Sequence, residues 1–254
     1  MDMQAIDKVA NLMASSNNTV VVTGAGISTE AGIPDFRGDK GIYRELGEER
    51  VMSIINIHAF RRSPELFYEL YRQYFSFPPV EPSKAHYMLA QLEQNGLVRA
   101  VVTQNIDDLH QRAGSKKVIP VHGTANRFLC TNIKCQAEFE EEYVKNYPEV
   151  VPLCDKCRGV IKPDVVLFGE PIQNAMDARD TILAARLLIV IGSSLTVYPL
   201  AGFVKEFSTF YQDLVIINKG YTQLDHAALV KIDTDTTGLV LEKIYKKISN
   251  MGRS

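Results

Sequence analysis

Short apolar runs recur along the chain, and each is followed by glycine or by polar residues. The first run, Thr19–Thr23, is rich in β-branched residues and ends at Gly24, which is typical of a strand covered on both faces. Similar runs predict strands at Val98–Thr103, Val118–Val121, Leu187–Ile191 and Leu214–Ile217. Helices are expected at Ala85–Gln94 and Asn174–Ala185, and at the N-terminus, where Ile6, Val9, Leu12 and Met13 suit one amphipathic face. This alternation predicts an α/β fold with a largely parallel sheet and helices on both faces.

Two stretches interrupt the alternation. Residues 41–82 lack strand signals and are rich in Tyr, Phe and Arg, so they are interpreted as a helical module. Residues 126–163 hold the cysteines and too little apolar material for a core of their own, so a metal would have to hold them together. We expect both insertions to form one small domain. The large domain then comprises residues 1–40, 83–125 and 164–254, with a cleft between the two.

Composition and charge indicate a folded, water-soluble protein. Of the 254 residues, 46% are hydrophobic and 23% charged, which excludes the profile of a disordered chain. The formal net charge of -2 provides no overall attraction to nucleic acid or to an anionic membrane. The N-terminus resembles no secretory or transit segment, and no run approaches the roughly 20 apolar residues that span a bilayer. We therefore expect a cytoplasmic protein without a membrane partner.

The four cysteines lie close together as two pairs, Cys130 with Cys135 and Cys154 with Cys157. Disulfides are rare in a reducing compartment, so this spacing favours a four-thiolate zinc site over two bridges or unbonded thiols. Four thiolates complete a tetrahedral shell and leave no position for water, which predicts a structural zinc. The acidic residues Glu138, Glu140, Glu141 and Glu142 argue against a ribbon that binds nucleic acid directly.

A glycine-bearing turn follows the first expected strand. Gly24, Ala25, Gly26 and Ser28 precede an expected helix, so backbone amides could hold a pyrophosphate there. The signal is weak by itself, because Thr29 stands where the usual dinucleotide fingerprint has its third glycine. A standard dehydrogenase is thereby disfavoured, and a plain tight turn stays open as an alternative.

Polar residues gather in the next loop and at the ends of the other strands. Asp35, Phe36 and Arg37 stand in a glycine- and proline-bounded loop that could fold over a cofactor or form a local Asp35–Arg37 pair. The residues at strand ends are Gln104, Asn105, Ile106, Asp107, His122, Gly192, Ser193, Ser194 and Asn218. Ligands bind at the carboxyl ends of parallel strands, and an imidazole there can serve as a general base. A lone histidine is nevertheless more often structural.

These motifs resemble, in their order, the sirtuin family of NAD-dependent protein lysine deacylases. The matching segments are GAGIST, GIPDFR, TQNID, HG, the paired cysteines, VVLFGE and GSS, and they extend from about Val20 to Asn218. The resemblance implies a Rossmann-like large domain, and a small domain built from a helical module and a zinc ribbon. It also implies that NAD, a consumed co-substrate, and the acylated-lysine protein or peptide enter the cleft from opposite sides.

The resemblance assigns roles residue by residue. It places NAD against Gly24, Ala25, Gly26, Ser28, Asp35, Phe36, Arg37, Gln104, Asn105, Ile106, Asp107, Gly192, Ser193, Ser194 and Asn218. It makes His122 the general base and Asn105 a second catalytic residue, with nicotinamide, free lysine and O-acyl-ADP-ribose as products. The substrate backbone would add as a strand between Phe168-Gly169-Glu170 and Val197-Tyr198.

The acyl group is expected to contact Tyr71 and Tyr74. Relatives that favour succinyl-like groups have a Tyr followed three residues later by an Arg, and here Tyr74 stands in the second place. The missing guanidinium predicts a preference for neutral acyl groups, although Arg72 lies nearby in the sequence.

Two other functions fit parts of the pattern. An NAD-dependent ADP-ribosyltransferase would use the same pocket, and release of O-acyl-ADP-ribose would discriminate against it. A nonenzymatic zinc module that senses NAD would not need His122, Asn105 and Asp107 together.

Overall fold

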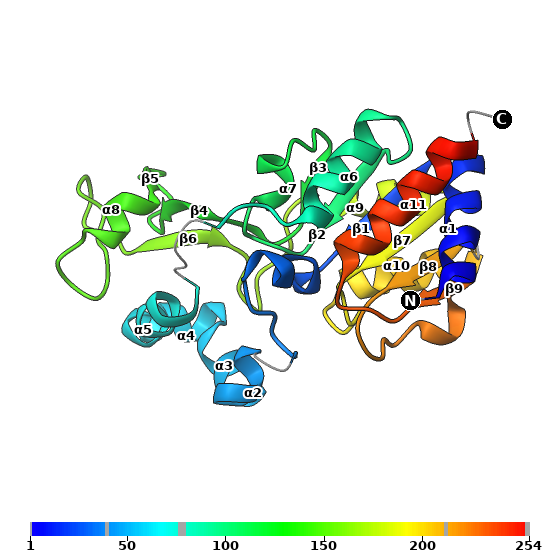
Figure 1. Cartoon of the computed structure of the whole chain (residues 1–254). Coiled ribbons are helices and arrows are strands. Elements are labelled where there is room, and N and C mark those ends of the chain that lie inside the picture. Colours follow the sequence, from blue (N-terminus) through cyan, green and yellow to red (C-terminus); the bar gives the residue numbers. More distant parts are fainter. Residues whose placement is uncertain (1, 39–40, 76–79, 211–212, 252–254) are drawn as a thin grey trace.

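The computed structural model describes residues 2–38, 41–75, 80–210 and 213–251. Its larger part is a six-stranded parallel sheet in the order β3-β2-β1-β7-β8-β9 (Figure 1). The strands are β1 (Thr19–Thr23), β2 (Ala100–Thr103), β3 (Val118–Pro120), β7 (Leu187–Ile191), β8 (Leu214–Ile217) and β9 (Val230–Ile232). The chain builds outward from β1 in one direction and from β7 in the other, so the order reverses between these two neighbours. Ligands bind at such a switch point in open α/β sheets.

The predicted strands are confirmed, with small differences at their ends. The bounds of β1, β7 and β8 are those expected, and every residue of these strands is buried. β2 begins at Ala100 rather than Val98, and β3 ends at Pro120 rather than Val121. β9 was not predicted, because it is short, lies at the sheet edge and has Lys231 at its centre.

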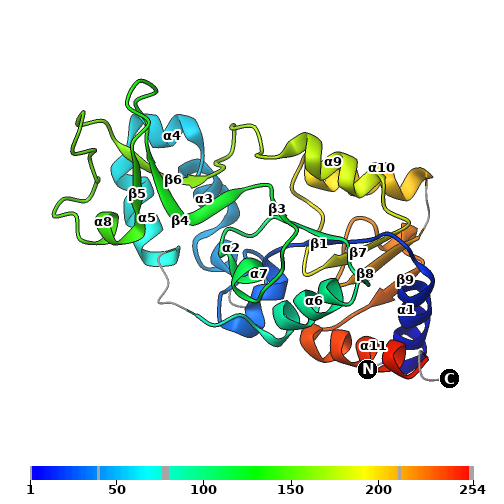
Figure 2. The same ribbon diagram turned by 90° about the horizontal axis from the view of Figure 1, so that it is seen from above.

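Helices cover both faces of the sheet, as the buried strands require (Figure 2). The helices α1 (Met3–Ser15), α6 (Lys84–Gln94) and α11 (Thr237–Met251) share a core with one face, and α9 (Ala175–Leu183) and α10 (Leu200–Phe210) share a core with the other. Side chains alternate between faces along each strand. Val21 therefore joins the first core, and Val20 and Val22 join the second.

The two interrupting stretches of the chain lie together beside the parallel sheet (Figure 1). The stretch predicted as a helical module contains α2 (Ile42–Leu46), α3 (Glu48–Ile54), α4 (Ile57–Arg62) and α5 (Pro64–Tyr74). The cysteine segment contains α8 (Glu141–Lys145) and an antiparallel sheet of β5 (Glu138–Glu140), β4 (Gly123–Cys130) and β6 (Ile161–Val165). This sheet begins before the predicted boundary at 126 and ends after that at 163, because Gly123 pairs with Val165 beyond an irregularity in β4.

The two insertions share one apolar core. Phe60 and Tyr68 from the helices pack with Phe128 and Ile161 from the cysteine segment, and all four are almost fully buried. The Tyr68 hydroxyl donates to the Ile161 carbonyl oxygen at 2.6 Å, so this buried polar group is satisfied. The helices thus supply the apolar surface that the cysteine segment lacks. Within the described part of the chain, no helix is both long and apolar enough to span a membrane.

Candidate active site

The predicted polar residues gather at the carboxyl edge of the parallel sheet. Gly24 follows β1, Gln104 follows β2, Gly192 follows β7 and Asn218 follows β8. His122 follows β3 and stands directly before β4, so it lies where the two sheets meet. The site therefore occupies the switch point of the fold.

Glycine is required where β1 and β7 end because their backbones touch. A Cβ added at Gly24 would lie 2.8 Å from the Gly192 carbonyl oxygen, and one added at Gly26 would lie 2.7 Å from the Gly192 Cα. The turn leads into a 3-10 helix, η1 (Ala25–Ala31), rather than an α-helix. The Gly24 N–H donates to the Ile191 carbonyl and the Gly26 N–H to the Gly192 carbonyl, so these two amides bind the neighbouring strand end. Two of the backbone amides that the motif offered to a pyrophosphate are thus already hydrogen-bonded within the protein.

Three predicted residues from separate motifs form one hydrogen-bond network. The Ser28 hydroxyl donates to Asp107 Oδ2 at 2.6 Å, and the Asn105 side-chain amide donates to Ser28 Oγ at 3.1 Å. The other Asp107 oxygen accepts the Leu109 N–H. Burial raises the pKa of Asp107, while the bonds from Ser28 and Leu109 act in the opposite sense. The network fixes the side chains of Asn105 and Asp107 beside the glycine turn.

One backbone contact determines the proton position of His122. Its Nδ1 lies 3.0 Å from the carbonyl oxygen of Gln104, which can only accept, so Nδ1 carries the hydrogen. Neutral His122 then has its lone pair on Nε2. Burial lowers its pKa from the usual 6.5, although the Gln104 bond opposes this shift. Near neutral pH, His122 is therefore an uncharged ring with a basic nitrogen available.

Gln104 links His122 to another strand end, because its backbone carbonyl binds His122 and its side chain binds Ser193. The Ser193 hydroxyl donates to Gln104 Oε1 at 3.0 Å, while the Ser194 hydroxyl lies 3.0 Å from that of Thr196. The Asn218 side-chain amide donates to the carbonyl of Lys219 within its own turn. The structure thus brings Ser193 into the central network, whereas Ser194 and Asn218 make local contacts.

The loop after the glycine turn is docked on the helical module. Arg37 pairs with Glu48 at 2.6 Å rather than with Asp35, and its guanidinium lies 4.9 Å from the Tyr43 ring centre. Asp35 instead accepts an N–H within its own loop. The Phe36 ring contacts Tyr43 with centroids 5.3 Å apart. The local Asp35–Arg37 pair considered from sequence is therefore not present.

The expected peptide-binding segments differ in what their backbones offer. Phe168 is already bonded to the helical module, since its N–H donates to the Ile55 carbonyl and its carbonyl accepts the Ile57 N–H, both at 3.0 Å. The extended run ends there, because Gly169 has φ +88° and lies in a turn closed by the Glu170 N–H, which donates to the Leu167 carbonyl at 3.0 Å. The Glu170 carboxylate accepts the Leu167 N–H at 2.9 Å.

On the other segment, the Val197 carbonyl accepts the Ala201 N–H at the start of α10. Tyr198 is 61% exposed, so its ring is open to a partner. A bound peptide could therefore contact the Tyr198 side chain in this segment, whereas the Val197 carbonyl is already used.

The two tyrosines expected at the acyl group have different neighbours. Tyr71 is buried in the shared core of the insertions. Tyr74 packs in a second cluster and donates its hydroxyl to Glu45 Oε1 at 2.8 Å. The Arg72 guanidinium binds the Glu149 carbonyl at 3.0 Å and so points to the cysteine segment.

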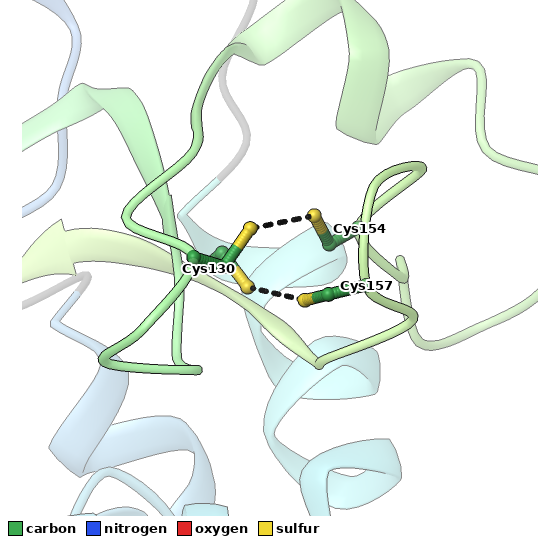
Figure 3. Close-up of side chains that lie close together, drawn as sticks. Cys130, Cys154 and Cys157 are labelled. Carbon is green, nitrogen blue, oxygen red and sulfur yellow. Dashed lines mark hydrogen bonds between the residues drawn. The ribbon is translucent and has the colours of Figure 1, made fainter.

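The four cysteine sulfurs converge at one point, as Figure 3 shows for Cys130, Cys154 and Cys157. All ligand atoms lie within 4.8 Å of one another, with 3.4 Å between Cys130 and Cys157 and 3.7 Å between Cys135 and Cys154. Four thiolates at about 2.3 Å from a zinc ion are separated by roughly 3.8 Å. A Cβ added at Gly159 would lie 3.1 Å from the Cys130 sulfur, so glycine makes room beside the cluster. The cysteines therefore fit one structural zinc ion.

Some residues that shape the site were not predicted. Thr23, Thr103 and His110 form a buried hydrogen-bonded group beneath Asn105. Their only signal in the sequence was a threonine at the end of two apolar strands. Glu45 and Glu48, which bind Tyr74 and Arg37, had no local signal at all.

The fold and site define an α/β protein whose switch-point site adjoins a cysteine ribbon, and comparisons with known proteins agree. A family model described as "Sir2 family" matches residues 24–199. An "NAD-dependent protein deacetylase" of Clostridium acetobutylicum is 41% identical over 95% of this chain and 98% of its own. That of Thermotoga maritima is 43% identical over 89% and 91%. The chain belongs to the Sir2 family, the sirtuins.

Solved structures show the same architecture throughout. A structure of a Sir2 enzyme matches with a TM-score of 0.87 and 37% identity, over 98% of this chain and 100% of its own. A Sir2 complex with a p53 peptide and NAD+ matches with a TM-score of 0.84 and 40% identity, over 100% of both chains.

Proposed function

We propose that this protein is an NAD-dependent protein lysine deacylase that releases nicotinamide, free lysine and O-acyl-ADP-ribose. The observation that carries the proposal is the state of His122. Its Nδ1–H is held by the Gln104 carbonyl, which leaves the lone pair on Nε2, and Gln104 directly precedes Asn105 of the Ser28–Asn105–Asp107 network. Relatives named NAD-dependent protein deacetylases and a Sir2 structure bound to acetylated peptide support the same activity.

NAD would lie across the switch point. The close approach of Gly24 and Gly26 to β7 brings the glycine turn against the end of β7, where the pyrophosphate is proposed to bind. Ser193, Ser194 and Asn218 are proposed to bind the ADP-ribose part. The nicotinamide and its ribose would be surrounded by Asp35, Phe36, Arg37, Asn105, Ile106 and Asp107.

The reaction then divides among a few side chains. The acyl oxygen of the substrate lysine attacks the ribose carbon that bears nicotinamide, and nicotinamide leaves as a neutral molecule. His122 Nε2 accepts a proton from a ribose hydroxyl, which attacks the acyl carbon. The Gln104 carbonyl stabilises the imidazolium that forms, because it accepts the Nδ1–H. Water then adds at the acyl carbon and the bond from that carbon to the lysine nitrogen breaks, so free lysine leaves and the acyl group stays on ADP-ribose. The zinc takes no part in these steps.

The acyl-lysine peptide is proposed to bind by strand addition. As in the resemblance, the incoming strand would lie between Phe168-Gly169-Glu170 and Val197-Tyr198, with Phe168 held in place by its bonds to the helical module. Backbone pairing of this kind reads little of the peptide sequence, which predicts a broad set of substrate proteins.

One assay tests the proposal. The purified protein is incubated with NAD and peptides carrying acetyl-, longer acyl- or succinyl-lysine, and all products are identified by mass spectrometry. Equal amounts of nicotinamide, free lysine peptide and O-acyl-ADP-ribose are expected. ADP-ribosylated protein or free ADP-ribose as the main product would favour a transferase or glycohydrolase, and no turnover would favour a nonenzymatic module.

A further inference from the structure

Two buried histidines lie outside the residues assigned so far. His86 belongs to α6 and His110 to α7 (Leu109–Arg112), and their side chains are 0% and 1% exposed. Their ring centres are 4.8 Å apart with an angle of 61° between the planes. Burial lowers the pKa of each ring, so both are neutral at physiological pH.

The proton of His86 is assigned by a backbone amide. The Ser83 N–H lies 3.2 Å from His86 Nδ1, and an amide N–H can only donate. Nδ1 therefore accepts, and the hydrogen of the neutral ring is on Nε2. That buried Nε2 has no hydrogen-bond partner among the described protein atoms.

The proton of His110 is assigned by two threonines. Thr23 donates its one hydroxyl hydrogen to Thr103 Oγ1 at 2.8 Å. Thr23 Oγ1 must then accept from His110 Nε2, which lies 2.9 Å away. The lone pair of His110 is consequently on Nδ1, which is buried and likewise unpartnered among the described protein atoms.

The two unpartnered atoms are complementary, since one is a donor and the other an acceptor on adjoining rings. Since the ring centres are 4.8 Å apart, a hydrogen bond between these two atoms, direct or through one buried water, is the contact that would satisfy both. Beyond the threonines, Thr103 Oγ1 also accepts the backbone N–H of Asn105 at 3.1 Å. The hydrogen bonds from His110 Nε2 through Thr23 to Thr103 therefore run in one direction, and a bond from His86 Nε2 to His110 Nδ1 would extend them in the same direction.

We propose that His86 and His110 form a directional hydrogen-bond relay, through Thr23 and Thr103, that positions residues 103–107 for the reaction. The inference rests on the proposed function, because residues 103–107 hold Asn105 and Asp107. Both histidines are positioning residues and touch no reacting atom. The relay works only if each ring carries its hydrogen on Nε2.

The kinetic test compares His110→Phe with His110→Gln. Phenylalanine keeps a ring but cannot donate to Thr23, whereas the glutamine amide can replace the Nε2 donor. We expect at least a ~10-fold rise in KM for NAD in His110→Phe, no change beyond about twofold in KM for the peptide, and recovery of most of the loss in His110→Gln. Phe207→Leu, in the core on the other sheet face, controls for lost stability without contact to the relay.

Equal kinetics for His110→Phe and the unaltered protein, or equal defects in His110→Phe and His110→Gln at matched stability, would overturn the proposal. Nitrogen NMR of histidine-labelled unaltered protein gives a test that needs neither a folded variant nor catalysis. Both rings should show a protonated Nε2 and an accepting Nδ1, and a hydrogen on Nδ1 of His110 would also overturn it. A protein with these tautomers but no deacylase activity would refute the proposed function and not the hydrogen-bonded relay.

Discussion

A single carbonyl oxygen, that of Gln104, decides how the His122 ring is protonated, and Ser193 in turn binds the Gln104 side chain. The proposed general-base role thus depends on the strand end that follows β2 as much as on His122 itself. Similar dependence holds for Asn105, whose side chain is held by Ser28 and whose backbone is held by Thr103.

Replacing His122 by alanine should reduce kcat for deacylation by about 10²- to 10⁴-fold, the usual contribution of a general base. NAD affinity, measured by calorimetry, should change little, because the imidazole is assigned to proton transfer. Replacement of the exposed His226 in η2 (Asp225–Ala227) is the matched control and should leave kcat intact. In the unaltered protein, kcat/KM should fall as the pH drops, with a midpoint below 6.5, since burial lowers the pKa of His122. Near-normal turnover of the alanine variant would remove His122 from the mechanism.

Neutral acyl-lysines should exceed succinyl-lysine in kcat/KM by at least ~100-fold, which requires about 2.7 kcal/mol. Tyr74 offers no cation, and its hydroxyl is bonded to the Glu45 carboxylate, which would repel a second carboxylate. Tyr74→Arg should narrow the gap, and more so when combined with Glu45→Gln, because Glu45 would otherwise pair with the new arginine. Tyr87→Arg, at a 47% exposed position of α6, is the matched control. Comparable rates on acetyl and succinyl peptides in the unaltered protein would contradict this assignment of the acyl site.

At the scale of elements, the helical module and the cysteine segment depend on each other. Their common core places Phe60 and Tyr68 against Phe128 and Ile161, so neither insertion is complete alone. The docked loop with Phe36 and Arg37 rests on the same helices. Loss of order at the cysteines should therefore reach the active site through packing.

One tightly bound zinc per chain is expected, measured by elemental analysis of protein purified without chelators. Cys154→Ala should lose the metal, lower the melting temperature and abolish most activity, because metal binding and folding of a small ribbon are coupled. Lys134→Ala, at an exposed position between the first two cysteines, should retain zinc and activity. Protein without zinc, or with a disulfide among these thiols, would contradict the prediction.

At the scale of the whole molecule, buried neutral histidines link stability to pH. Burial lowers the pKa of His86 to about 4 and that of His110 to about 3, from 6.5 in the unfolded chain. At pH values between the folded and the unfolded pKa, the unfolded chain binds more protons than the folded protein. The contribution of the two histidines to the free energy of unfolding is therefore complete above pH 6.5 and is lost as the pH falls. At pH 5 each histidine should reduce the free energy of unfolding by about 2 kcal/mol relative to neutral pH.

Urea unfolding at pH 7 and pH 5 measures this loss. Carboxyl groups with a lowered pKa, such as Asp225, reduce the free energy of unfolding only at lower pH. Asp107, whose pKa is raised, makes the folded protein more stable as the pH falls and so opposes the loss from the histidines. The double variant His86→Asn/His110→Gln should be less stable at pH 7 but should lose much less between pH 7 and pH 5. Replacement of the exposed His58 should leave the difference unchanged. An equal loss in the double variant would show that other groups cause the acid sensitivity.

The sequence by itself determined most strands of the parallel sheet, the cysteine site and the family. Buried parallel strands are continuous β-branched and apolar runs, so β1, β7 and β8 could be predicted to the residue. Paired cysteines carry their ligand spacing in the sequence, and ordered motifs identify a family without any contact being known. Each of these signals depends on residues that are close in the sequence, so it can be recognised without the structure.

Only the tertiary structure decided how these parts are held and protonated. The contact of Thr23 with His110 joins residues 87 positions apart, and Arg37 pairs with Glu48 rather than with Asp35, the local partner that the sequence left open as an alternative. The two predicted tyrosines, Tyr71 and Tyr74, were likewise separated into different clusters. The physical reason is that a hydrogen atom on a ring, or the partner of a charge, depends on what folding brings within about 3 Å, and residue type and spacing carry no record of that distance.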